Sequence, residues 1–150
     1  MLMATIALNV SALAQNGGVA EWPESMASGT IPLMIVNTEN AAPIVDKETN
    51  IPASLYVTVP AAYKHGPGSK EAPVALTIKG RGNASWNFPK KPYKIKFESK
   101  TAVLGMPKHK HFALIPFASG YAEWLGAYAG MELGRMTGMP WAPNIEPCEL

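Results

Sequence analysis

Basic residues are concentrated in one part of this 150-residue chain, between positions 79 and 111. Nine of the thirteen lysines and arginines lie there with a single acid, Glu98, so the segment has a formal charge of +8 while the whole chain has only +2. A patch of this density is typical of a site for an anion: a nucleotide, a phosphorylated ligand, an acidic polymer or an anionic surface. The near-neutral total does not suggest nucleic-acid binding. The alternative is that Lys94 and Lys96 form only the solvated face of a strand and protect its edge from pairing.

The segment Gly80-Arg-Gly-Asn-Ala-Ser-Trp86 lies inside this basic part and follows an expected strand. Its two glycines permit an irregular backbone that can turn several N–H groups toward an anion. It matches neither standard glycine-rich nucleotide motif, and the alternative is a hairpin connection in which Trp86 and Phe88 cover the core. The candidates for phosphate or nucleotide binding, ranked by charge and placement, are Lys94 first and Arg81 second, followed by Lys79, Lys96, Gly80, Gly82 and Asn83.

Other residue types with catalytic or metal-binding potential are scarce. His109 and His111 are two positions apart and could share a metal, but they lack a third ligand, so surface histidines beside lysines are the favoured interpretation. Three histidines and a single aspartate, Asp46, leave little material for hydrolytic chemistry. We therefore expect no catalytic residue and no metal ligand in this chain. The single cysteine, Cys148, excludes an internal disulfide.

The basic segment requires a sheet to position it. Apolar and polar residues alternate, or apolar residues run together, in five short segments, separated by stretches rich in proline and glycine. This pattern predicts an α+β fold with a mostly antiparallel sheet that has one face in water. The expected strands are 33–36, 54–59, 74–78, 93–97 and 112–115.

One main helix is expected over about residues 121–137, ending at Gly138 and Pro140. Glycines at positions 126, 130 and 134 form a ridge that is favourable only where another backbone packs closely against it, so we expect close packing at this ridge. Glu123 and Glu132 argue against a membrane span in this region.

The two ends of the chain suggest export and a further strand. Residues 1–14 resemble a signal peptide that ends in Ala12-Leu13-Ala14, although a positive region is missing, so an ordinary apolar helix is the alternative. We favour export to the periplasm or cell surface, with no transmembrane segment after cleavage. Residues 15–30 read as a linker and residues 31–150 as the folded domain, whose last residues, 144–150, have the pattern of a further strand.

Three blocks of this domain resemble the CotH spore-coat protein kinase family. They are Leu76-Thr-Ile-Lys-Gly-Arg-Gly-Asn-Ala-Ser-Trp-Asn-Phe-Pro-Lys-Lys-Pro-Tyr-Lys-Ile-Lys-Phe97, Leu104-Gly-Met-Pro-Lys-His-Lys-His-Phe-Ala-Leu114, and Glu132-Leu-Gly-Arg135 followed by Gly138-Met-Pro-Trp-Ala-Pro143. The stretch 31–51 is similar to the segment that precedes these blocks in secreted members from gut Bacteroidetes. The resemblance covers about residues 31–150.

The resemblance implies the small-lobe part of an atypical protein-kinase-like fold. Some family members transfer the γ-phosphoryl group of ATP to protein serines with a divalent metal, Mg or Mn. Such chemistry needs positive groups on the phosphates, carboxylates on the metal and a carboxylate near the attacking hydroxyl. The segment 79–96 would supply the first of these, with Lys94 as the phosphate ligand.

Two departures from the family bear on activity. Family members continue past the position that matches Leu150 into a half that holds the metal-binding and catalytic aspartates. They also commonly have Arg-Asn where this chain has Gly126 and Ala127. We therefore expect an amino-terminal fragment of an exported CotH-like protein that transfers no phosphoryl group by itself. The alternative is a secreted β-rich module that holds an anionic or carbohydrate polymer through residues 79–111, with Trp86, Phe88 and Tyr93.

Overall fold

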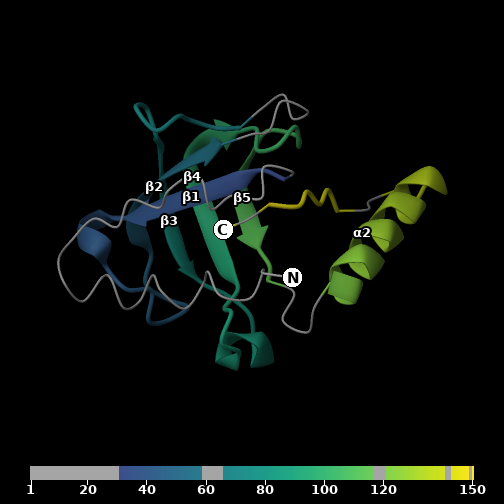
Figure 1. Cartoon of the computed structure of the whole chain (residues 1–150), viewed down its shortest axis with the longest axis horizontal. Coiled ribbons are helices and arrows are strands. Elements are labelled where there is room, and N and C mark those ends of the chain that lie inside the picture. Colours follow the sequence, from purple (N-terminus) through teal and green to yellow (C-terminus); the bar gives the residue numbers. More distant parts are fainter. Residues whose placement is uncertain (1–30, 59–65, 117–120, 141–142, 149) are drawn as a thin grey trace.

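The computed structural model describes residues 31–58, 66–116, 121–140, 143–148 and 150, so the predicted signal peptide and linker lie outside it. Figure 1 shows one twisted sheet and a separate helix. The sheet has the order β1-β2-β3-β4-β5, and each strand is antiparallel to the one before it. The elements are β1 (Leu33–Thr38), η4 (Glu39–Ala41), β2 (Ile51–Thr58), β3 (Val74–Gly80), η5 (Ala84–Asn87), β4 (Tyr93–Thr101), β5 (His109–Leu114) and α2 (Tyr121–Met136). The expected α+β class, antiparallel sheet and single main helix are confirmed for the described residues.

The core lies on one face of this sheet. Leu76 stands opposite Phe97, and Ile78 stands opposite Ile95, so alternate residues of β3 and β4 reach the same side. Phe97 and Ile95 are both fully buried. The Phe97 ring also meets the Phe112 ring of β5 edge to face, with 5.8 Å between ring centres. A slip of one residue would move these apolar side chains into water, so burial fixes the register.

Chain segments next to the strands cover the core face. Val103 and Leu104 are buried in the turn that follows β4, and Met106 donates its N–H to the Val103 carbonyl at 2.9 Å. Before β2, Ala42 and Ile44 pack against the same cluster. The core is therefore closed by connections, and the sheet does not need a helix over its centre.

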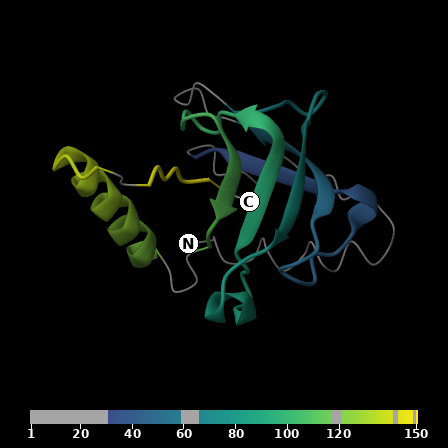
Figure 2. The same cartoon turned by 180° about the vertical axis from the view of Figure 1, so that it is seen from behind.

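The helix α2 lies to one side of the sheet, beyond β5, in both Figure 1 and the reverse view of Figure 2. Its apolar residues Leu125, Leu133 and Met136 are exposed. A Cβ atom added at Gly126 or Gly130 would meet no described atom within 4 Å. The close packing that we predicted for the glycine ridge is therefore wrong at these two positions. Within the described residues, no helix has both the length and the apolar character needed to cross a membrane.

The end of α2 follows the sequence prediction, whereas the tail does not. Gly138 has a φ of 73° and donates its N–H to the Arg135 carbonyl at 3.1 Å, which is a common way for glycine to end a helix. Residues 143–148 form no strand, so the strand expected from residue 144 is not found in the described tail. Instead, Arg135 pairs with Glu132 and donates to the Asn144 side-chain oxygen at 2.9 Å, which ties the tail to the helix.

Candidate functional site

The basic residues of three neighbouring strands gather on the sheet face that points away from the core. Lys79 of β3 stands directly opposite Lys94 of β4, and Lys96 stands opposite His111 of β5. Directly opposite residues in an antiparallel pair have Cβ atoms about 4.5–5.5 Å apart. We call this set of four residues, Lys79, Lys94, Lys96 and His111, the basic face. Three predicted phosphate ligands therefore come together, and the structure adds one that sequence reasoning did not include.

Among the described residues, no ion pair within 4.0 Å joins the basic face to an acid, although Glu98 is two positions after Lys96 on β4. Like charges directly opposite one another destabilise a sheet. In the part of the chain that the structure describes, the one ion pair within 4.0 Å is Arg135–Glu132, which lies on α2. The pKa of the Asp46 carboxyl is lowered mainly by hydrogen bonds from Thr49 and Glu48, and the positive charge of Lys79 has a smaller effect on it. A bound anion would relieve the repulsion between the lysines.

Exposure of the basic face makes it accessible to a ligand. Lys94, Lys96 and His111 are exposed, and Lys79 is half-buried. Thr77, a short side chain, stands opposite Lys96 on β3, and Ala113 stands opposite Lys94 on β5. The long lysine side chains therefore rise from a surface of short neighbours and can converge on one anion or follow an extended one.

His111 lies among several positive charges. Its pKa is lowered, first by desolvation and then by the positive charges of Lys94 and Lys96, with smaller effects from His109 and Lys110. The His111 N–H donates to Nδ1 of His109 at 3.0 Å. Over the described ranges no three histidine, cysteine, aspartate or glutamate side chains come together as a metal site. Both histidines are exposed on β5.

At the start of the loop after β3, backbone N–H groups form hydrogen bonds within the protein. The Gly80 N–H donates to the Asp46 carbonyl at 3.0 Å, and the Arg81 N–H donates to the Pro92 carbonyl at 3.1 Å. Gly80 also faces the core side, where an added Cβ would lie 2.5 Å from Asp46 O and from the Trp86 ring. The loop joins two antiparallel strands, as the hairpin alternative predicted. These two amides are committed to the fold and do not point freely at a ligand.

The remaining candidates for phosphate binding in this loop are not arranged around one common site. Gly82 has a φ of 92°, and an added Cβ would come close to the Ser85 hydroxyl, which explains why glycine is needed there. Asn83 is exposed, and its carbonyl accepts the Trp86 N–H at 3.2 Å. Arg81 is exposed at the start of the loop. The structure therefore brings together the strand lysines, and it does not show the loop residues converging with them.

The aromatic residues near the loop are only partly available. The Trp86 ring packs against Gly80 and meets the Tyr93 ring edge to face at 6.3 Å. Lys91 places Nζ 4.8 Å from the centre of the same ring and donates to the Trp86 carbonyl at 2.6 Å. Tyr93 is half-buried, and this burial raises the pKa of its hydroxyl. Phe88 is 46% exposed, so the prediction that it covers the core is wrong.

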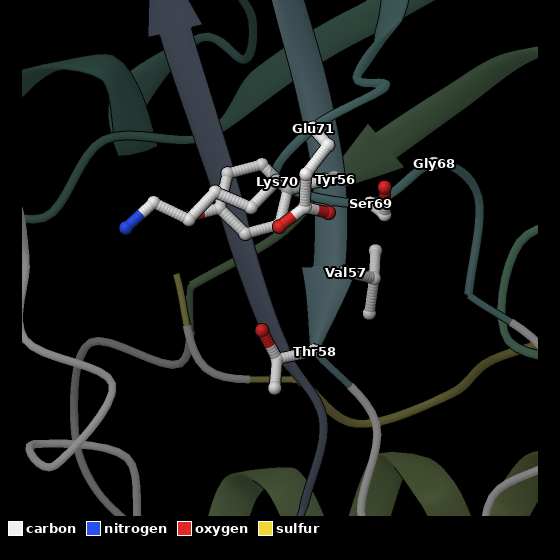
Figure 3. Close-up of a pocket in the computed structure, with 7 residues that line it drawn as sticks. All are labelled: Tyr56, Val57, Thr58, Gly68, Ser69, Lys70 and Glu71. Atoms are coloured by element: carbon white, nitrogen blue, oxygen red, sulfur yellow. The ribbon is translucent and has the colours of Figure 1, made fainter.

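An open depression of the described surface lies elsewhere. It has a volume of about 410 Å³ and is formed by the end of β2 and the loop at residues 68–71 (Figure 3). It contains one lysine and one glutamate, Lys70 and Glu71, so it has no excess of positive charge. Its lining residues are Tyr56, Val57, Thr58, Gly68, Ser69, Lys70 and Glu71. The excess of positive charge on the basic face thus lies outside this depression.

In comparisons with known proteins, no family model, no curated protein and no solved structure matches this chain.

His111 could have been found from the sequence with one change. We predicted a strand beginning at Phe112, whereas β5 begins at His109. Since Phe112 packs toward the core, strand alternation places His111 on the outward face beside the lysines. The signal was present, but a run of three basic and polar residues does not look like a strand when it is considered alone.

Proposed function

We propose that this sheet is the phosphate-binding part of an exported CotH-like, atypical protein-kinase-like protein. The observation that carries the proposal is the placement of Lys79, Lys94 and Lys96 on one face of β3 and β4, without acidic partners among the described residues. Ammonium groups and a histidine are suitable donors for phosphate oxygens. The resemblance in residues 76–97 supports a nucleotide phosphate as the ligand.

The proposed role is binding and not transfer. Phosphoryl transfer also needs carboxylates for a divalent metal and for the attacking hydroxyl. Asp46, the single aspartate of the sequence, accepts hydrogen bonds from Glu48 N, Thr49 N and the Thr49 hydroxyl. The basic face thus suits the phosphates of ATP, but the described residues do not fit the Mg or Mn that the resemblance implies. We derive no catalytic step through a metal.

Calorimetric titration with ATP, with and without magnesium, tests this proposal. We expect heat of binding for the unmodified chain and at least about a tenfold weaker affinity for Lys94→Gln, since a charge-assisted bond to phosphate contributes about 1.5–3 kcal/mol. Lys90→Gln is the matched control, because Lys90 is also an exposed lysine and lies in the loop between β3 and β4. Equal affinities for both variants and the unmodified chain would show that the basic face does not hold the nucleotide.

A second candidate function is the binding of an anionic polymer. It is favoured by the openness of the basic face and by the position of Lys94 and Lys96 on the same side of β4. Positions two residues apart in a strand are separated by about 6.8 Å along it, so Lys94 and Lys96 are spaced along β4 in a way that suits an extended polyanion. Salt-sensitive binding of an acidic polysaccharide together with no heat for ATP would favour this function over the first.

A further inference from the structure

Two histidines lie at the edge of the basic face, on the last strand of the sheet. His111 stands in register with Lys96, and His109 is two residues before it on β5. Their ring centres are 6.0 Å apart. Histidine is the side chain whose ordinary pKa lies in the mildly acidic range, so protonation of His111 can change the charge of the face without a change of fold.

His109 contacts the backbone of its neighbour on the same strand. The His111 N–H donates to Nδ1 of His109 at 3.0 Å, and the His111 carbonyl lies 3.1 Å from the same nitrogen.

We propose that anion binding on the basic face is coupled to proton uptake by His111, so that affinity rises in mildly acidic solution. This inference rests on the proposed function, because it needs an anion on the lysines. It applies equally to a nucleotide phosphate and to an anionic polymer.

The coupling follows from the groups that face His111. Lys94 and Lys96 approach it from β4, Lys79 lies one strand further away on β3, and Lys110 and His109 flank it on β5. Glu98 is the acid on β4, and it lies in the irregular part of the strand after Lys96, where the pairing with β5 is broken. The positive neighbours oppose protonation of His111 while the face is empty.

An anion bound between the lysines changes this balance. It offsets their positive charges and adds a negative charge close to the His111 ring, which favours the imidazolium. By linkage, a proton on His111 must then strengthen anion binding by the same factor. A rise of about one unit in the pKa of His111 on binding corresponds to about tenfold in affinity.

The test uses an anion whose own charge is constant. Phosphate loses charge as the pH falls through its second pKa of about 6, which would oppose the effect, whereas sulfate esters stay ionised. We would measure the affinity of the full chain for inositol hexasulfate by calorimetry at about pH 8 and about pH 5.5, where histidine changes its charge. The expected result is an affinity roughly three- to tenfold higher at the lower pH, with net proton uptake seen as a dependence of the heat on the buffer.

Substitution separates the histidines from one another. His111→Gln should lose most of the pH dependence. His65→Gln, which replaces the third histidine of the sequence, is the matched control and should keep the full dependence. Equal affinity of the unmodified chain at both pH values would overturn the coupling and leave the anion site intact. No binding at either pH would instead overturn the proposed function.

Discussion

Lys79 and Lys94 stand directly opposite each other in β3 and β4, on the sheet face that points away from the core. The residues beside them in each strand, Ile78 and Ile95, are also paired and are buried on the other face. The same register therefore builds the core and brings two positive charges together. Burial of the core side chains stabilises this register, although the two lysines repel each other in it. An anion bound beside both lysines would reduce that repulsion.

Removal of one of these charges should stabilise the fold while it weakens binding. Lys94→Gln is expected to raise the free energy of unfolding by about 0.2–1 kcal/mol at low ionic strength, because it removes a like-charge contact across the strands. The gain should shrink in high salt, where exposed charges are screened. Urea denaturation at two salt concentrations measures this difference, with Lys90→Gln as the control. A loss of stability at low salt would show that Lys94 has a favourable partner.

The core should depend strongly on the aromatic side chain at its centre. Phe97 is fully buried and touches Phe112 edge to face. Phe97→Ala is expected to lower the free energy of unfolding by about 3–5 kcal/mol, whereas Phe97→Leu should lower it much less, since it leaves a smaller cavity. The exposed Phe88→Ala is the matched control and should change stability by less than about 0.5 kcal/mol. Similar losses for Phe97→Ala and Phe88→Ala would contradict this core.

The sheet could be predicted from the sequence because its signal is local. Alternation in segments such as Val74–Ile78 and Tyr93–Phe97 identifies both the strands and the side that each residue faces. Lys79, Lys94 and Lys96 could be chosen as candidates for the same reason. The exact partner of each residue came only from the structure, since register depends on how neighbouring strands pack.

The remaining elements depend on contacts that are distant in the sequence. The glycines of α2 suggested close packing, but spacing alone does not show where a helix lies, and Gly126 and Gly130 face open space. The apolar pattern of the tail suggested a strand, whereas Arg135 ties residue Asn144 to the helix. His111 was missed because its role depends on Lys96, which lies fifteen positions earlier in the chain and is its partner across the sheet.

Two glycines should respond in opposite ways to the same substitution. Gly80→Ala would place a Cβ 2.5 Å from both the Asp46 carbonyl and the Trp86 ring, so we expect a loss of about 1–3 kcal/mol from overpacking. Gly126→Ala meets no described atom within 4 Å on α2 and should stabilise the helix by about 0.5–1 kcal/mol, because alanine is the better helix former. Thermal unfolding followed by circular dichroism measures both. Destabilisation by Gly126→Ala would indicate that another backbone packs against that glycine.

Asp46 should make stability depend on acid. Its carboxylate accepts hydrogen bonds from the backbone and the hydroxyl of Thr49 and from the backbone of Glu48, and these hold its pKa below the ordinary value of 3.8. Because the pKa is lower in the folded state, the carboxylate stabilises the fold above pH 3.8, and this contribution is lost as the pH falls through the lowered value. Asp46→Ala should therefore be less stable than the unmodified chain at neutral pH and should approach it in strong acid. Glu39→Ala, which replaces an exposed acid in the first turn of η4, is the control. Urea titrations between about pH 2 and about pH 7 measure the difference, and a gap between the curves that stays constant with pH would show that ionisation of Asp46 has no part in it.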